Sequence, residues 1–137
     1  MTLERLQQYG IIVEQIELIK REYIPSYITA IDTSKSSVQN SNISDITADI
    51  AIQQMNIDPA IKKEYARLKQ ELKELNDFIF NIKDELIRAI VIRRFIPGKD
   101  GKVMIWDDIA RDLHYSKKYC QKLMKSFARE YLNNAPI

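Results

Sequence analysis

An apolar side chain recurs in alternating steps of four and three residues over a long central stretch of the chain. The positions are Ile61, Tyr65, Leu68, Leu72, Leu75, Ile79, Ile82, Leu86 and Ala89. This heptad spacing places them along one stripe of an α-helix, and such a helix is stable only when another helix covers the stripe. The spacing therefore predicts an all-α fold organised around a long, coiled-coil-like helix.

The partner of this stripe is open to two interpretations. The long helix can fold back on an N-terminal helix of the same chain and form a helical hairpin, or it can pair with a second chain. The stripe is longer than one helix of about 20 residues can cover at about 1.5 Å per residue, so both uses can coexist. We expect a homodimer, and the pattern leaves open whether the paired helices run parallel or antiparallel.

Local signals divide the chain into three parts. Residues 1–58 begin with an amphipathic helix that Thr2 caps. This helix is expected to end near Tyr23, because Pro25 disfavours helical geometry in the residue before it. A Ser- and Asn-rich linker follows. Within it we expect a short helix with three apolar residues facing inward: Ile46, Ile50 and Met55.

The other two parts begin with clear helix signals. Asp58 and Pro59 are the expected cap and first residue of the long amphipathic helix, which we assign to residues 59–83. Residues 81–84 mark a join. Residues 84–137 form the third part, a C-terminal domain whose first helix is evenly apolar and ends before Pro97.

Charge is distributed unevenly along the 137 residues. Residues 1–58 carry four basic and eight acidic side chains, whereas residues 59–137 carry 17 basic and 11 acidic ones. A polyanion is therefore expected to bind the C-terminal part. The sequence has no signal-peptide pattern, no apolar stretch long enough to span a bilayer, and a single cysteine. These features predict a cytoplasmic protein without membrane contact or disulfide.

Residues 106–126, WDDIARDLHYSKKYCQKLMKS, predict two short amphipathic helices separated by a turn. The first has an apolar face (Trp106, Ile109, Ala110, Leu113) and an acidic first turn that suits the helix dipole. His114 and Tyr115 make the turn, and Ser116 caps the second helix. The expected inward positions of the second helix are Cys120, Leu123, Met124, Phe127, Ala128 and Tyr131.

The outward faces of the second helix are basic. From His114 to Arg129 there are five cationic side chains and no acidic one. An unmixed basic face on the second helix of a helix-turn-helix is typical of a recognition helix in the major groove of DNA. Lysines would contact phosphates, while Gln121, Tyr119 and Lys118 would reach base edges. For Arg93 and Arg94, a phosphate contact and a plain solubility role are equally good interpretations. The candidate DNA-binding residues are Ser116, Lys117, Lys118, Tyr119, Gln121, Lys122, Lys125, Arg93 and Arg94.

These residues carry a resemblance to a known family. The stretch from Arg93 to Leu132 resembles the region-4 helix-turn-helix of bacterial sigma factors, and the chain is most similar to small phage-encoded transcriptional regulators of the RinA and ArpU type. The matching features cover about the last third of the chain: Arg94, the run Trp106-x-x-Ile109-Ala110-x-x-Leu113, Tyr115-Ser116, and apolar residues four, seven and eleven positions beyond Ser116.

The resemblance implies that residues 117–125 contact promoter DNA and that the protein activates late or packaging genes of a phage or prophage. It also implies that the protein recruits RNA polymerase. Three features depart from the family pattern: Ile105 replaces the usual Ser or Thr cap, His114 replaces a turn glycine, and the loop at residues 97–103 is longer. This loop is either a small wing or, as we favour, a surface insertion.

Other functions are less well supported by the sequence. A small terminase subunit for DNA packaging usually carries its helix-turn-helix at the N-terminus, and a protein–protein adaptor would use the basic face to bind an acidic partner. No cofactor or small-molecule substrate is expected, because nucleotide-binding glycine motifs are absent. His114 has no metal-ligand partner at a suitable spacing, and Cys120 is expected to be a buried thiol. We therefore expect neither an enzyme nor a metal site.

Overall fold

The computed structural model describes residues 1–23 and 49–132, and their regular elements are helices. This confirms the all-α fold. Residues 49–54 are helical, and the remaining helices are α1 (Leu3–Gln7), α2 (Tyr9–Tyr23), α5 (Pro59–Phe80), α6 (Glu85–Phe95), α7 (Trp106–Leu113) and α8 (Lys117–Tyr131). The chain forms two compact units: one contains residues 1–12 and 71–137, and the other contains residues 13–70. Helices α2 and α5 each contribute to both units.

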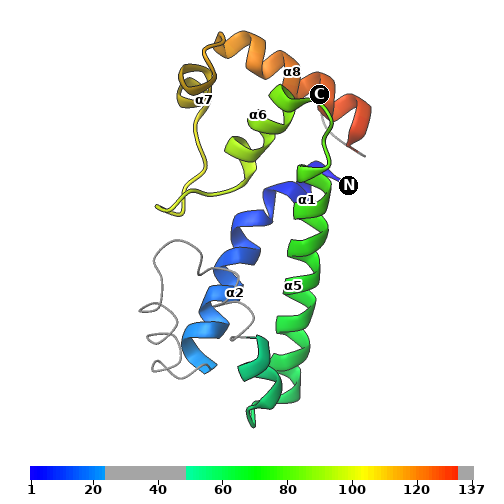
Figure 1. Ribbon diagram of the computed structural model, residues 1–137, viewed down its shortest axis with the longest axis vertical. Coiled ribbons are helices and arrows are strands. Elements are labelled where there is room, and N and C mark those ends of the chain that lie inside the picture. The colour runs from blue at the N-terminus through cyan, green and yellow to red at the C-terminus, as the bar shows by residue number, and fades with distance from the viewer. Residues whose placement is uncertain (24–48, 133–137) are drawn as a thin grey trace. The chain divides into compact units, whose positions relative to one another are not determined.

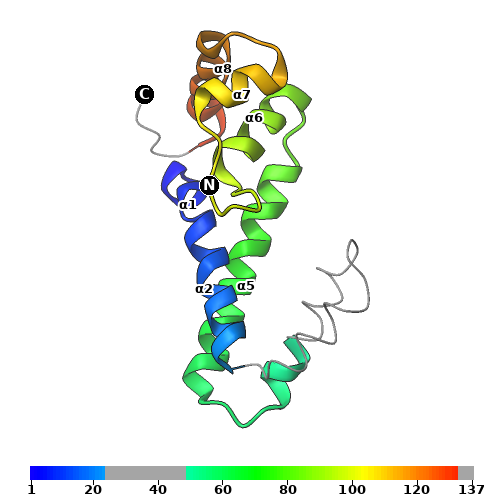
Figure 2. The same ribbon diagram turned by 90° about the vertical axis from the view of Figure 1, so that its left-hand side faces the viewer.

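The unit of residues 13–70 is an antiparallel pairing of the second half of α2 with the first half of α5 (Figures 1 and 2). Its buried side chains include Ile16, Tyr65 and Leu68. The Tyr65 hydroxyl donates a hydrogen bond to the Asp49 carboxylate at 2.5 Å, which ties the helical residues 49–54 to α5. At the expected helix start, the Asp58 carboxylate accepts the Ala60 N–H at 2.9 Å.

The expected short helix around residue 50 exists, but its inward face was wrongly assigned. Ile52 is 2% exposed and Ala51 is buried beside it, whereas Ile50 is 47% exposed. Met55 is half-buried just after the helical residues, and Ile46 lies outside the described part of the chain. Because so short an apolar run fits two helical faces almost equally well, the spacing alone did not identify the buried one.

In the other unit, the N-terminal residues pack on the end of α5. Thr2 caps α1 as expected, by accepting the Arg5 N–H at 3.2 Å. Arg5 pairs with Glu74 at 2.7 Å, and the Tyr9 hydroxyl donates a hydrogen bond to Asn76 at 2.6 Å. Burial raises the pKa of the Tyr9 phenol, although this hydrogen bond lowers it in part. These contacts hold the first residues of the chain against the end of α5, as the hairpin interpretation expects.

This hairpin bears directly on the expected dimer. Four stripe positions, Tyr65, Leu68, Leu75 and Ile79, are at most 4% exposed within one chain. These four positions offer no surface to a second chain, whereas Ile61, Leu72 and Ile82 of the same stripe are only half-buried. The homodimer remains a prediction. The long helix also ends at Phe80, earlier than residue 83, and residues 81–84 form the expected join. There Asp84 starts α6 by accepting the Leu86 and Ile87 N–H groups at 2.9 and 3.1 Å.

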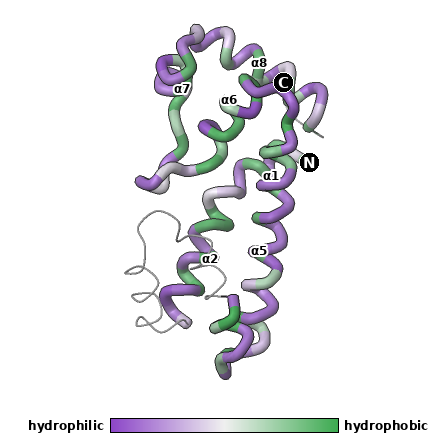
Figure 3. Tube along the Cα trace, in the orientation of Figure 1, coloured by the Kyte–Doolittle hydropathy of each residue, from purple (hydrophilic) through white to green (hydrophobic). Residues whose placement is uncertain are grey.

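Helices α6, α7 and α8 belong to the unit of residues 1–12 and 71–137. They form one cluster in both views (Figures 1 and 2). Their shared core consists of Ile90, Val91, Phe95, Ile109, Cys120, Met124 and Phe127. Cys120 is buried, as expected for a structural thiol. Most of α5 and α8 is coloured hydrophilic in Figure 3, in keeping with a single apolar stripe on each. Within the described ranges, none of the helices combines the length and hydropathy that crossing a membrane requires.

The hairpin leads to a stability prediction for α5. Leu68→Ala should lower the free energy of unfolding by about 2–5 kcal/mol, because it leaves a cavity in the core. The control Leu18→Ala, at a position 46% exposed on α2, should cost no more than about 0.5 kcal/mol. Urea unfolding followed by circular dichroism measures both. The loss at Leu68→Ala should be the same at low and at high protein concentration. A loss that grows with protein concentration would show that a second chain also covers the stripe.

Candidate nucleic-acid interface

Helix α7 begins without a side-chain cap. Ile105 occupies the cap position, is 58% exposed and makes no capping hydrogen bond. Asp107 and Asp108 lie in the first turn, where their negative charge interacts favourably with the exposed N–H groups. On the inward face, Ile109 is fully buried, and Trp106, Ala110 and Leu113 are half-buried. Helix α7 is therefore held mainly by the packing of one apolar face.

The turn after α7 depends on a left-handed residue. His114 has φ 63° and ψ 36°, and it is the only non-glycine residue with positive φ in the described part of the chain. This conformation lets the N–H groups of His114 and Tyr115 both donate to the Ala110 carbonyl, the latter at 3.1 Å. Histidine tolerates this region better than most side chains, although glycine fits it without steric cost. His114 thus adopts a left-handed conformation that favours glycine.

Helix α8 begins as the sequence predicts. The Ser116 hydroxyl accepts the Tyr119 N–H at 3.1 Å, so Ser116 is the N-cap. The inward positions Cys120, Met124, Phe127 and Ala128 are buried and Leu123 is half-buried. Tyr131 was expected inward but is 58% exposed. Its ring lies 5.4 Å from that of Phe127 at the end of the helix, where the core no longer covers it.

The outward side of α8 carries a surface that we call the lysine face, made of Lys117, Lys118, Lys122 and Lys125. All four side chains are exposed, and Gln121 beside them is half-buried. Lys117 lies 3.5 Å from Asp107 of α7, whereas no other described residue forms a salt bridge with the remaining three lysines. No described residue therefore compensates their positive charge, which can attract an anionic partner.

The two predicted arginines occupy a different place from the lysine face. Arg93 donates hydrogen bonds to Asp112 of α7 at 2.7 Å and to the Ala89 carbonyl at 3.1 Å. The Arg94 guanidinium lies 5.1 Å above the Trp106 ring, within range of a cation–π interaction, and donates to the Met104 carbonyl at 3.4 Å. Both arginines therefore join α6 to α7 and its preceding loop. Their contact with phosphates remains a prediction.

Two exposed aromatic residues adjoin the lysine face. Tyr115 in the turn is 48% exposed and Tyr119 in the first turn of α8 is 42% exposed. Their ring centroids are 5.4 Å apart. Sequence reasoning included Tyr119 among the candidate residues and missed Tyr115, because Tyr115 lies in the turn before the helix, where helical spacing gives no signal. We refer to them as the tyrosine pair.

The loop between α6 and α7 folds back on α6 without forming a strand within residues 97–105. The Gly98 N–H donates to the Lys102 carbonyl at 3.0 Å, and the Met104 N–H donates to the Arg93 carbonyl at 3.1 Å. Pro97 approaches the start of α2 closely: a Cβ added at Gly10 would lie 3.1 Å from the Pro97 Cγ. The sequence pattern did not indicate this contact. The closeness of Pro97 explains why a glycine stands at position 10 of an amphipathic helix.

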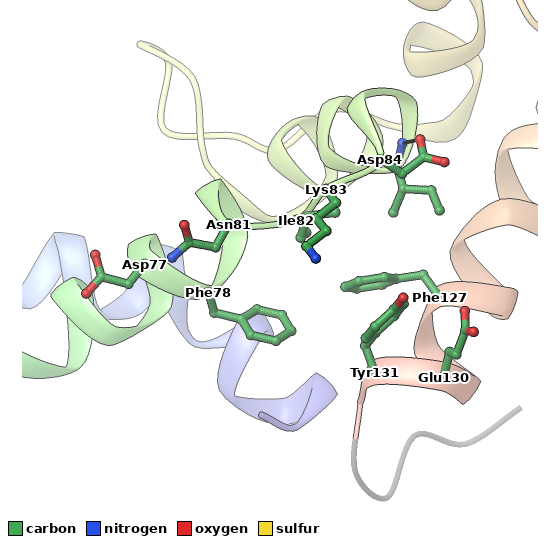
Figure 4. A pocket seen from close by; sticks show the side chains of 10 residues that line it. Asp77, Phe78, Asn81, Ile82, Lys83, Asp84, Phe127, Glu130 and Tyr131 are labelled. Atoms are coloured by element: carbon green, nitrogen blue, oxygen red, sulfur yellow. Dashed lines mark hydrogen bonds between the residues drawn. The ribbon is translucent and has the colours of Figure 1, made fainter.

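A cavity of about 620 Å³ lies between the end of α5, the join at 81–84 and the last turns of α8 (Figure 4). Its wall includes Phe78, Phe127 and Tyr131, and the centroids of the two phenylalanine rings are 6.2 Å apart. Two of its carboxylates already have partners, since Asp77 pairs with Lys73 at 3.0 Å and Asp84 caps α6. The aromatic contacts across this cavity attach α8 to α5.

Neither a metal site nor a similar known protein helps to assign a function to this chain. Within residues 1–23 and 49–132, no three His, Cys, Asp or Glu side chains are grouped so that they would hold a metal ion. No family model matches the sequence, and no curated protein or solved structure is significantly similar to it. The functional interpretation therefore rests on the geometry and charge of the chain itself.

The left-handed turn generates a prediction. His114→Gly should leave the free energy of unfolding unchanged or raise it by up to about 1 kcal/mol, because relief of steric strain offsets the greater entropy of the unfolded chain. His114→Val should lower it by at least about 1 kcal/mol. The control Ser126→Gly, in the interior of α8, should cost about 0.5 kcal/mol. Thermal and urea unfolding measure all three variants. A loss at His114→Gly as large as at the control would disprove this account of the turn.

Proposed function

We propose that the protein is a sequence-specific DNA-binding transcriptional regulator that places the N-terminal half of α8 in the major groove. The observation that carries the proposal is the lysine face, in which three of the four exposed lysines make no salt bridge to any described residue. The turn at His114 and the cap at Ser116 fix the direction of its helix. The phosphate backbone is the polyanion that such a face matches best.

The neighbouring elements are compatible with this role. In helix-turn-helix proteins the second helix enters the groove by its N-terminal residues, while the first helix crosses the backbone. Here α8 is joined to α7 by the short turn of residues 114–116, and its buried face packs on α6 and α7. The exposed face is thus left for a partner. Arg93 and Arg94, which hold α7, are assigned a positioning role in addition to any phosphate contact.

The resemblance to phage regulators gives the biological setting of the proposal. The protein would act in the bacterial cytoplasm as an activator of late phage or prophage genes, binding promoter DNA and recruiting RNA polymerase. Paired half-sites would require two copies of the chain, and these copies would meet through surface that one chain leaves uncovered.

Fluorescence anisotropy with labelled duplexes tests the proposal. One duplex comes from the DNA flanking the gene and the other is its scrambled version. Four to six phosphate contacts predict a slope of about −4 to −5 in log K against log salt concentration. The double variant Lys118→Glu, Lys122→Glu should weaken binding by at least about tenfold and reduce the magnitude of the slope by about 2.

A matched control distinguishes an effect of the lysine face on binding from an effect of the protein's net charge. Lys63→Glu with Lys83→Glu makes the same change in charge at two exposed lysines outside α8 and should bind the flanking duplex nearly as the parent does. Equal weakening by both double variants would show that binding depends on overall charge. Equal affinity for both duplexes would favour a packaging or architectural role. No binding at low salt would overturn DNA binding and favour an adaptor for an acidic protein.

A further inference from the structure

We propose that the tyrosine pair determines sequence specificity by contacting the C5-methyl group of thymine in the major groove. This inference rests on the proposed function, because it takes α8 as the helix that enters the groove. It goes beyond that function by naming the base feature that is recognised and the side chains that recognise it. Lysine contacts with phosphates account for affinity, whereas sequence is read by the side chains that contact base edges.

The tyrosine pair contributes little to the core. Tyr115 and Tyr119 are 48% and 42% exposed, and their ring centroids lie 5.4 Å apart with 35° between the ring planes. Within the described ranges, neither phenol hydroxyl makes a hydrogen bond. Two large aromatic side chains are thus held together at the surface, with their remaining apolar area available to a partner.

The position of the pair matches the part of the helix that reads bases. Tyr115 lies in the turn, one residue before the N-cap, and Tyr119 lies in the first turn of α8. Tyr119 follows Lys118 in the sequence. It also lies three residues before Lys122, so its side chain neighbours that of Lys122 on the helix surface. If these lysines contact phosphates, the two rings lie beside them at the start of the helix, the part that meets base edges in helix-turn-helix proteins.

Thymine presents the feature that an aromatic ring can recognise there. Its C5-methyl group is the apolar group that the bases of DNA expose in the major groove, and apolar side chains contact it directly. Cytosine lacks this methyl group, so burial of a tyrosine ring against it favours T·A over C·G at the contacted position. The contact is made by the ring, and the phenol hydroxyl is not required.

Replacing thymine by uracil tests this directly, because it removes the methyl group and leaves base pairing unchanged. The preferred site is first selected from random duplexes, and each thymine is then replaced singly. At one or two positions uracil should weaken binding by about three- to tenfold, as expected for loss of a buried methyl contact. Tyr115→Ala or Tyr119→Ala should abolish this discrimination, whereas Tyr115→Phe and Tyr119→Phe should retain it.

Tyr131→Ala is the control, since Tyr131 is also an exposed tyrosine, at the other end of α8. This variant should discriminate thymine from uracil as the parent does. The inference is overturned if the protein binds a specific duplex and uracil is neutral at every position, or if the selected site contains no thymine. Those outcomes leave the proposed function intact. Failure to bind any duplex overturns both.

Discussion

The left-handed backbone of His114 determines how the rest of the candidate interface is arranged. With φ at 63°, two successive N–H groups donate to the Ala110 carbonyl, so α7 ends abruptly and the chain turns within three residues. Ser116 then begins α8 by capping it. These hydrogen bonds set the direction of α8. They thereby determine which of its side chains are buried and which are exposed. A residue that could not adopt this conformation would shift Cys120 and the lysine face together.

The core of α6, α7 and α8 holds that geometry in place. Ile109 and Cys120 are fully buried on the two helices that flank the turn. Arg93 and Arg94 supply polar contacts between α6 and α7, through Asp112 and Trp106. At the far end of α8, Phe127 packs against Phe78 of α5. Because packing uses one side of α8 from end to end, the opposite side is free to carry lysines and exposed tyrosines.

Much of this arrangement was predictable from the sequence, because its signals are local. The caps at Thr2, Asp58 and Ser116, the join at residues 81–84 and the buried face of α8 from Cys120 to Ala128 follow from side-chain chemistry and helical spacing. What failed depends on tertiary contacts. Neither the burial of Ile52 in place of Ile50, nor the exposure of Tyr131, nor the approach of Pro97 to Gly10 follows from spacing along one helix. The arginines were ambiguous for the same reason, since their partners are distant in sequence.

The central claim is that the N-terminal half of α8 is the surface that meets DNA. Backbone amide chemical-shift mapping of the labelled full chain, titrated with the preferred duplex, tests it most directly. The account predicts that the largest shifts occur at residues 115–125, with smaller ones in α7, and that the amides of residues 59–70 in α5 change little. Shifts concentrated around the aromatic cavity at Phe78 and Tyr131, with none at residues 115–125, would contradict the claim and place the interaction elsewhere on the protein.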